Sequence, residues 1–290
     1  MKKTLTPVAI LLLVAALLGA GCDVADKRVE IRFKFKPGMN LHYTELSRGS
    51  YKVFYGDSLA QDMSNEITKD LLWAVDSLRD DSAARITESM TYRVQSVSNL
   101  DTAITDSTRE RKELILYIMP NGKITDVDFG SEPATRYVKS YLDQGLPVFP
   151  AGAHGQGYQW TQTTAVQLAE GPVEATTTFE IKSFAREQGY DCVIIGYRAN
   201  MVLPIEASRE EMPPKEQVNR TYEFLGGRDN ITSTGHIYFA YTEGHVVRQK
   251  ERWILDGNRN YLVLKTGDTS ATRIAVEYDV DYQLQRVAQN

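Results

Sequence analysis

The sequence predicts a mainly β fold. Two similar antiparallel meanders are expected to form a curved sheet, a half-barrel or a sandwich, with one connecting helix. Three observations support this prediction: long segments that alternate between apolar and polar residues, one segment with helical spacing, and a repeated order of strands and turns. The 290 residues are enough for one large domain or two small ones.

The clearest alternation runs from Ile274 to Leu284. Apolar side chains occupy every second position, and most positions between them are charged or polar. The apolar set is Ile274, Val276, Tyr278, Val280, Tyr282 and Leu284, and the polar set is Arg273, Glu277, Asp279, Asp281 and Gln283. This period of two predicts a strand with one solvated face, and at about 3.3 Å per residue the strand spans roughly 35 Å.

Two further segments alternate in the same way. Val173 to Ile181 places apolar residues and threonine opposite polar residues. Ala84 to Val94 also alternates, except that Glu88 interrupts its apolar side. Long antiparallel strands with one apolar face favour a strongly curved sheet, a barrel or a half-barrel.

One segment has the signals of a helix. Ser131 is a suitable N-cap, Pro133 fits the first turn, and Gly145 can end the helix. Apolar residues recur between them at helical spacing: Ala134, Tyr137, Val138, Tyr141 and Leu142. We therefore expect one connecting helix, followed by a rigid extended linker at 146–150.

Three other stretches predict connections. Gly152 to Gly157 is glycine-rich but joins a linker to a strand, so a flexible entry to the second half is favoured over a phosphate site. Glu206 to Asn219 contains two adjacent prolines and many charges, which predicts a long exposed loop. Leu255-Asp256-Gly257-Asn258 predicts a turn.

The two halves of the chain share an order of elements. An apolar strand, a turn with one glycine and a return strand surround Gly122 in the first half and Gly244 in the second. Ala84 to Val94 would then match Cys192 to Met201. Any two β-meanders look alike to some degree, but three elements in a shared order favour a duplication.

The start of the chain has the order of a bacterial secretory signal. Lys2 and Lys3 precede an apolar run of about fourteen residues, Leu5 to Leu18, and Gly19-Ala20-Gly21 leads to Cys22. This junction resembles the lipobox of bacterial lipoproteins, in which the cysteine is acylated and becomes the mature N-terminus. The resemblance implies lipidation of Cys22 and a membrane-anchored protein of the bacterial cell envelope, facing the periplasm or the exterior.

Two other fates of this segment stay open. A typical lipobox has Leu, Val or Ile where Gly19 stands, so ordinary cleavage after Ala20 would leave a soluble secreted protein. An uncleaved anchor is the third alternative, although the apolar run is shorter than the roughly 20 residues that a bilayer core needs. On the lipoprotein interpretation the divisions are a signal peptide at 1–21, a lipid-anchored tether at 22–28, a first β repeat at 29–130, a helix and proline linker at 131–150, and a second β repeat with a C-terminal hairpin at 151–290.

Turn and core residues carry a second resemblance. Phe35-Lys-Pro-Gly38 with Tyr43, the expected central helix, and Leu146 to Pro150 with Gly157-x-x-Trp160 resemble a family of two-repeat bacterial lipoproteins of unknown function. In architecture alone, a lipid-anchored curved sheet with one helix is similar to the lipoprotein carriers of the Lol system. In those half-barrels the concave face holds an acyl chain or a peptide, so this resemblance implies an apolar ligand or an envelope protein as partner. A fold by itself does not fix a function.

Composition excludes some classes of function. The formal net charge is −5 and no basic stripe is present, which argues against nucleic-acid binding. Of the two cysteines, Cys22 is assigned to lipid, so Cys192 has no partner for a disulfide in the mature chain. Its apolar surroundings predict a buried structural thiol rather than a nucleophile.

No catalytic, metal or cofactor site emerges from the motifs. Nucleophile-elbow, zinc-protease, Walker and dinucleotide signatures are all absent from the sequence. The sequence has four histidines, His42, His154, His236 and His245. We expect their side chains to be solvated or half-buried. Asp126 and Asp128 share one side of a predicted strand and could form a carboxylate pair, but water-facing side chains are expected there.

Aromatic residues are numerous, and they could form the core or line an apolar pocket. We expect most of them to form the core: Tyr43, Trp73, Trp160, Tyr197, Tyr238, Phe239, Tyr241 and Trp253. The favoured function is a non-catalytic envelope lipoprotein that binds a partner or an apolar ligand. The alternatives are a periplasmic hydrolase with an unrecognised site, which would need histidines and carboxylates to converge, and a structural spacer.

Overall fold

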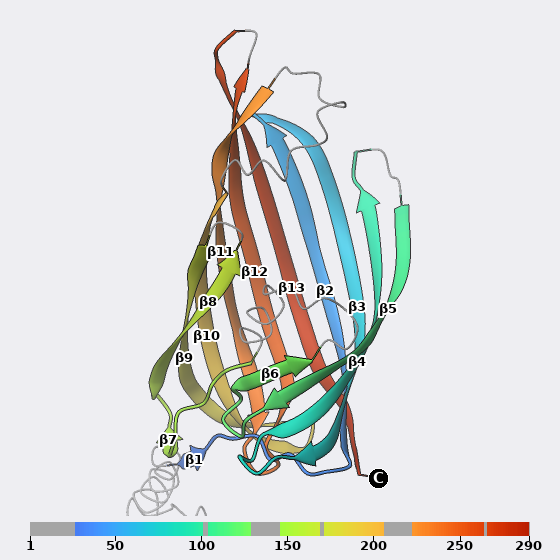
Figure 1. Cartoon of the computed structure of the whole chain (residues 1–290), viewed down its shortest axis with the longest axis vertical. Coiled ribbons are helices and arrows are strands. Elements are labelled where there is room, and N and C mark those ends of the chain that lie inside the picture. Colours follow the sequence, from blue (N-terminus) through green and yellow to red (C-terminus); the bar gives the residue numbers. More distant parts are fainter. Residues whose placement is uncertain are drawn as a thin grey trace, which may run out of the picture.

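Long antiparallel strands make up almost all of the described chain (Figure 1). The structure is a computed structural model, and it describes residues 27–100, 104–128, 146–168, 171–205, 222–263 and 266–289. The strands of the first half are β1 (Arg28–Glu30), β2 (Met39–Tyr55), β3 (Ser58–Leu78), β4 (Ala84–Ser98), β5 (Ile104–Ile118) and β6 (Ile124–Asp128). Those of the second half are β7 (Ala153–Gly155), β8 (Gln159–Leu168), β9 (Gly171–Glu187), β10 (Tyr190–Ile205), β11 (Tyr222–Ala240), β12 (His245–Val263) and β13 (Thr269–Gln289). The predicted mainly β fold is confirmed.

Two meanders join into one antiparallel sheet of eleven strands. Its order is β6-β5-β4-β3-β2-β13-β12-β11-β10-β9-β8, so β2–β6 form one meander and β8–β13 the other. The two are linked by the pairing of β2 with β13. In the described chain the end strands β6 and β8 do not pair with each other, so the sheet is open. A separate two-stranded sheet is formed by β1 and β7.

The two predicted glycine hairpins hold the same place in their meanders. Gly122 lies in the turn between β5 and β6, and Gly244 lies in the turn between β11 and β12. Each is the fourth hairpin of its meander. The order of the elements agrees with a duplication. That these hairpins coincide when residues 30–130 are superposed on 150–255 stays a prediction.

Each long strand separates two faces of the sheet. Residues that are paired across strands lie on the same face, and successive residues point to opposite faces. Tyr43 is paired with Leu71 and Leu284, and Ile195 is paired with Ile181 and with a residue of β11. We call the face that carries these side chains the inner face and the opposite one the outer face. The predicted apolar set of Ile274 to Leu284 falls on the inner face of β13, whose 21 residues make it longer than predicted.

The inner face curves around a cluster of phenylalanines at one end of the sheet. Phe33 packs edge-on against Phe239 of β11 with ring centroids 5.2 Å apart, and Phe149 packs against the same ring at 4.9 Å. One buried cluster includes these rings together with core residues of β5, such as Leu116, and of β10, such as Ile195. Because strands near both ends of the sheet contribute to one cluster, the inner face is concave.

Backbone hydrogen bonds fix these phenylalanines against the two glycine hairpins. The Phe33 N–H donates to the carbonyl oxygen of Pro120 at 2.7 Å, beside Gly122. The Lys34 N–H donates to the carbonyl oxygen of Gly244 at 3.0 Å. Phe149, in the predicted linker 146–150, donates to the carbonyl oxygen of Asn121 at 2.8 Å. The linker is therefore part of the core, and these two segments close one end of the curved sheet.

Two predicted connections are wrong. Within Gly152 to Gly157, Ala153–Gly155 forms β7, which pairs with β1 and so is not a flexible entry. The predicted turn at Leu255-Asp256-Gly257-Asn258 lies within β12. A Cβ at Gly257 would lie 2.3 Å from an Asp229 carboxylate oxygen, so this glycine makes room for a neighbouring strand rather than for a turn.

Several predictions fall outside the described residues. These are the signal peptide with Cys22, the helix at 131–145 and the exposed loop at 206–219. Arg28, the last residue of the predicted tether, already belongs to β1. Within the described ranges, the structure has no helix that is long and apolar enough to cross a membrane.

Candidate functional site

The inner face changes character beyond the phenylalanine cluster. A band of polar residues, the polar belt, crosses it first. Further along the strands the inner face again carries many apolar side chains, and most of these are half-buried, although Val53 beside Ile274 is buried. The polar belt consists of Glu45, Ser47, Lys69, Tyr197, Ser233, Gln249 and Glu251. The second region, the open apolar zone, consists of Tyr51, Met63, Met201, Ile231, Trp253, Leu255, Ile274, Val276 and Tyr278.

The polar belt is held by side-chain hydrogen bonds in two groups. On β2 and β3, Glu45 accepts a bond from Ser47 Oγ at 2.8 Å and pairs with Lys69 Nζ at 2.7 Å. On the other side, Gln249 donates to the hydroxyl of Tyr197 at 3.0 Å. Glu251 accepts bonds from Gln249 and Ser233. Burial and the nearby Glu251 carboxylate raise the pKa of Tyr197, so this hydroxyl stays protonated.

A buried ion pair marks the far end of the open apolar zone. Arg259 donates to both carboxylate oxygens of Asp229, at 2.6 and 3.0 Å. The side chains of Arg259 and Asp229 are only 18% and 9% exposed. A bidentate pair of this kind satisfies both charges, although the cost of removing them from water limits its net contribution to stability.

The charged residue that interrupts the alternation of β4 also has a partner on the inner face. Glu88 is 7% exposed, and its carboxylate accepts a hydrogen bond from Trp73 Nε1 at 2.9 Å. Trp73 lies directly opposite Glu88 on β3. The buried carboxylate is therefore satisfied within the core and needs no ligand to explain it.

The four histidines lie apart from one another. His42 is 3.9 Å from Asp70, and His154 Nε2 lies 2.9 Å from the Ala151 carbonyl oxygen. His236 is exposed on the outer face of β11. His245 is buried without a hydrogen-bond partner for either ring nitrogen, and burial lowers its pKa to about 4. Among the described residues, no three metal-ligating side chains come together.

The other candidate residues from the sequence have ordinary surroundings. Asp126 and Asp128 are both exposed, on the outer face of β6. Cys192 is fully buried, and burial raises the pKa of its thiol to about 12, which leaves it protonated and unreactive. Cys22 lies outside the described residues.

Most of the aromatic residues form the core, as expected. Tyr43, Trp73 and Phe239 are buried in the main cluster. Three others are half-buried and pack against it: Trp160, Tyr197 and Tyr241. Tyr238 packs on a smaller cluster around Cys192. Trp253 belongs to neither cluster and is half-buried in the open apolar zone, beside Tyr278.

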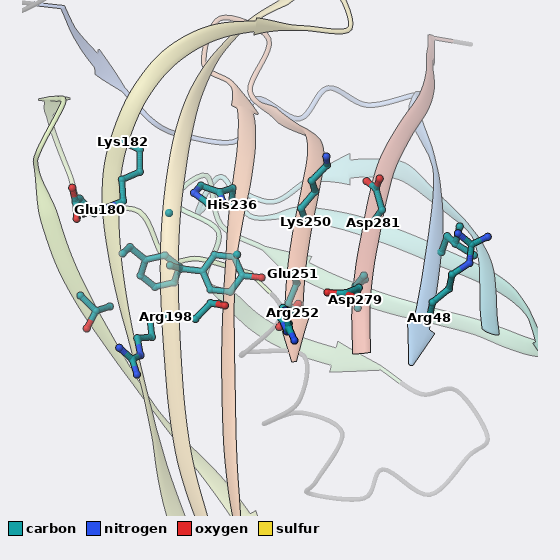
Figure 2. A pocket seen from close by; sticks show the side chains of 18 residues that line it. Arg48, Glu180, Lys182, Arg198, His236, Lys250, Glu251, Arg252, Asp279 and Asp281 are labelled. Atoms are coloured by element: carbon teal, nitrogen blue, oxygen red, sulfur yellow. Dashed lines mark hydrogen bonds and ion pairs between the residues drawn. The ribbon is translucent and has the colours of Figure 1, made fainter. Parts of the chain in front are cut away.

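The outer face carries an open hollow of about 1000 Å³ across β9–β13 and β2 (Figure 2). Two cross-strand rows of residues line it. The first row is Glu180, Gly196, His236, Lys250, Asp281 and Leu46. The second row is Thr178, Arg198, Thr234, Arg252, Asp279 and Arg48. Figure 2 shows His236, Lys250 and Asp281 side by side, with Arg198, Arg252, Asp279 and Arg48 in the other row.

Neither the polar belt nor the hollow was predicted from the sequence. Alternation assigns Arg198, Thr234 and Arg252 to outer faces, but only the strand register shows that they are neighbours. A hairpin register for β10–β12 would have been the one signal able to find them.

Comparisons with known proteins identify no family. No protein-family model matches the chain, and no curated protein sequence matches it. Several solved structures match most of this chain at low sequence identity and low TM-score. Lipovitellin, from a study of lipid–protein interactions, has a TM-score of 0.48 and 10% identity over 88% of this chain. This chain spans only 26% of the lipovitellin chain.

Two bacterial structures are also similar. An exported protein with a YmcC-like fold from Bacteroides fragilis NCTC 9343 has a TM-score of 0.31 and 10% identity, over 90% of this chain and 100% of the other. An outer membrane channel from Pseudomonas putida F1 has a TM-score of 0.23 and 8% identity, over 90% of this chain and 99% of the other. Because all three TM-scores lie below 0.5, these structures assign no function to this chain.

Proposed function

We propose that this chain is a non-catalytic lipoprotein of the bacterial cell envelope whose curved sheet holds an apolar ligand against the inner face. The observation that carries the proposal is the open apolar zone. Its aromatic and aliphatic side chains, such as Trp253, Leu255 and Val276, are half-buried, although they continue the face that forms the core at the other end. Concave apolar surfaces with a few placed polar groups are typical of small-molecule sites.

The boundaries of the open apolar zone fit an elongated apolar ligand with a polar end. The polar belt lies on one side of the zone and the Asp229–Arg259 pair on the other. Burial of hydrocarbon is worth about 0.8 kcal/mol per methylene, so eight methylenes of an acyl chain would gain about 6 kcal/mol. This gain is enough for binding without any catalytic group.

Anchoring through Cys22 is the second part of the proposal. The ordered basic, apolar and small-residue segments before Cys22 support it. Lys27 begins the described chain beside β1, at the end closed by the phenylalanine cluster. Four residues lie between Cys22 and Lys27, and the five steps from one Cα atom to the next span at most about 18 Å. The closed end would therefore lie near the membrane, with the open apolar zone further away.

Binding is favoured over hydrolysis by the placement of the titratable groups. The described histidines lie on separate elements, and the carboxylates of the polar belt are engaged by Lys69, Ser47, Ser233 and Gln249. A hydrolase would need a nucleophile or a water-activating base with a free face toward a substrate. A spacer would need no open apolar zone.

The test compares two neighbouring positions on β12. Leu255 is half-buried on the inner face, and Ile254 is 38% exposed on the outer face. The full-length chain is expressed in a bacterium, purified gently and analysed by native mass spectrometry and lipid extraction. We expect the wild type and Ile254→Glu to retain an apolar ligand, and Leu255→Glu to lose at least nine-tenths of it. If the wild type carries no ligand and takes up no added fatty acid, the ligand proposal is wrong, and a protein-binding or structural role becomes the better one.

A further inference from the structure

A group of basic side chains surrounds Thr234 in the outer hollow. Arg198 on β10 and Arg252 on β12 are both paired with Thr234. His236 is the next residue on the same face of β11, and Lys250 is its partner on β12. All five side chains are exposed. We call Arg198, His236, Lys250 and Arg252 the basic centre.

The positions nearest to Thr234 on this face carry no carboxylate. They are the four residues of the basic centre together with Gly196, Asn200, Thr232 and Ile254. The carboxylates of the hollow lie further out, and two of them have other partners. Glu180 accepts a hydrogen bond from Lys182 at 2.7 Å, and Asp281 accepts one from Arg248 at 2.9 Å. Arg248 holds the pKa of the Asp281 carboxyl below its usual range.

Two cations of the basic centre have no ion-pair partner in the part of the chain that the structure describes. Arg252 pairs with Glu277, but neither Arg198 nor Lys250 lies within 4.0 Å of a described carboxylate. Lys250 acts on Asp281 only at longer range. The chain has 38 acidic residues and a net charge of −5, so carboxylates are not scarce. Arg198 and Lys250 lie on the two strands that flank β11, and a bound anion would neutralise both of them. Arg252 bonds Glu277 through one guanidinium nitrogen, which leaves its other donors for the anion.

The shape of the centre suits a small oxyanion. Strands lie about 4.8 Å apart, so the Cα atoms of Arg198 and Arg252 are roughly 10 Å apart, within reach of two long side chains that converge above Thr234. Thr234 offers only a hydroxyl as the floor, and on the β10 side the Lys182 side chain lies over Gly196, where a Cβ would be 2.9 Å from Lys182 Cε. Guanidinium groups bind phosphate oxygens in a bidentate manner, and an ammonium group adds a compact charge.

We propose that the basic centre is a binding site for a phosphate group. The group is either inorganic phosphate or the phosphate ester of a lipid headgroup. Arg198 and Arg252 would hold it from two sides, with Lys250 and the Thr234 hydroxyl as further donors. The site lies on the face opposite the open apolar zone, so it is independent of the proposed apolar ligand.

Calorimetric titration of the full-length chain in a non-ionic detergent tests the proposal. Inorganic phosphate at low salt should bind at a single saturable site and weaken as salt rises. The double variant Arg198→Gln/Lys250→Gln should bind at least tenfold more weakly. Arg273→Gln, which removes an exposed arginine paired with Asp256 on the same face, is the matched control and should change the affinity less than twofold.

Two further measurements identify where the phosphate group comes from and show whether this site is independent of the open apolar zone. Glycerol 3-phosphate that binds tenfold more tightly than phosphate would indicate a lipid headgroup, and equal binding would indicate the free ion. Leu255→Glu should leave phosphate binding unchanged whether or not it loses an apolar ligand. Absence of saturable phosphate binding to the wild type, or an equal loss in Arg273→Gln and in the double variant, would overturn the proposal.

Discussion

Replacing Gly244 with alanine tests two structural requirements of this turn, a positive φ and room for the backbone of Lys34. Gly244 has a φ of 79°, which side chains of L-residues rarely adopt. A Cβ there would also lie 2.5 Å from the backbone nitrogen of Lys34. Gly189, in the turn between β9 and β10, has a φ of 87° but nothing within 4 Å of its Cβ position. Gly189→Ala is therefore a control with the same backbone strain and no close approach.

The expected cost follows from the contacts that Gly244→Ala displaces. The left-handed backbone costs about 1–2 kcal/mol in either variant. At Gly244 the new methyl also pushes away Lys34, which loses its N–H bond to Gly244 and its ammonium bonds to the Tyr241 and Thr242 carbonyl oxygens. One neutral bond and the charged donor together are worth about 2–3 kcal/mol. We expect a loss in the free energy of unfolding of about 3–5 kcal/mol for Gly244→Ala, and about 1–2 kcal/mol for Gly189→Ala.

Urea denaturation followed by tryptophan fluorescence measures both values. Trp73 lies in the core near this end of the sheet and should report the transition. If Gly244→Ala is no less stable than Gly189→Ala, the segment around Lys34 does not depend on close contact with the hairpin. The inferred closure of this end of the sheet would then be wrong.

Two other predictions concern the anchor and the buried histidine. Cys22→Ser should move the protein from the membrane fraction to the soluble or uncleaved precursor fraction and abolish fatty-acid labelling; an unlabelled wild type with unchanged partitioning would contradict the anchor. Because burial lowers the pKa of His245 from 6.5 to about 4, the unfolded chain binds a proton between these pH values that the folded chain does not, so stability falls as the pH drops. From pH 7 to pH 4 the wild type should lose about 3 kcal/mol more than His245→Phe in denaturant titrations, and equal losses would show that His245 is not the group responsible.

The alternation of the sequence was sufficient to predict individual strands. Ile274 to Leu284 shows the reason, because its apolar set lies on the inner face and its polar set on the outer face along the whole segment. Glu88 looked like an exception, and the sequence alone could not show that Trp73, on the paired strand, donates a hydrogen bond to it. Local pattern reports which face a residue takes, while its partner depends on register.

The composition of a turn gave a wrong prediction where a glycine leaves room for a side chain of a neighbouring strand. Asp256-Gly257-Asn258 has the composition of a hairpin turn. All three residues nevertheless lie within β12 and are paired with β11 and β13. Asp229, whose carboxylate occupies the space beside Gly257, is 30 residues away in the chain from Arg259, its ion-pair partner. The basic centre was hidden for the same reason, since Arg198 and Arg252 lie on two strands that are separated by β11.

The length of the strands is the strongest reason to look for a function beyond the buried end. The phenylalanine cluster and the residues packed on it occupy only part of β2, β12 and β13, which have 17, 19 and 21 residues. Beyond the polar belt most of the apolar inner side chains are half-buried, so this part of the sheet gains less from burial than it would in a closed core. Ordering those residues still costs conformational entropy. A ligand on the open apolar zone would supply the missing burial, and large exposed apolar surfaces in folded proteins commonly mark the places where something binds.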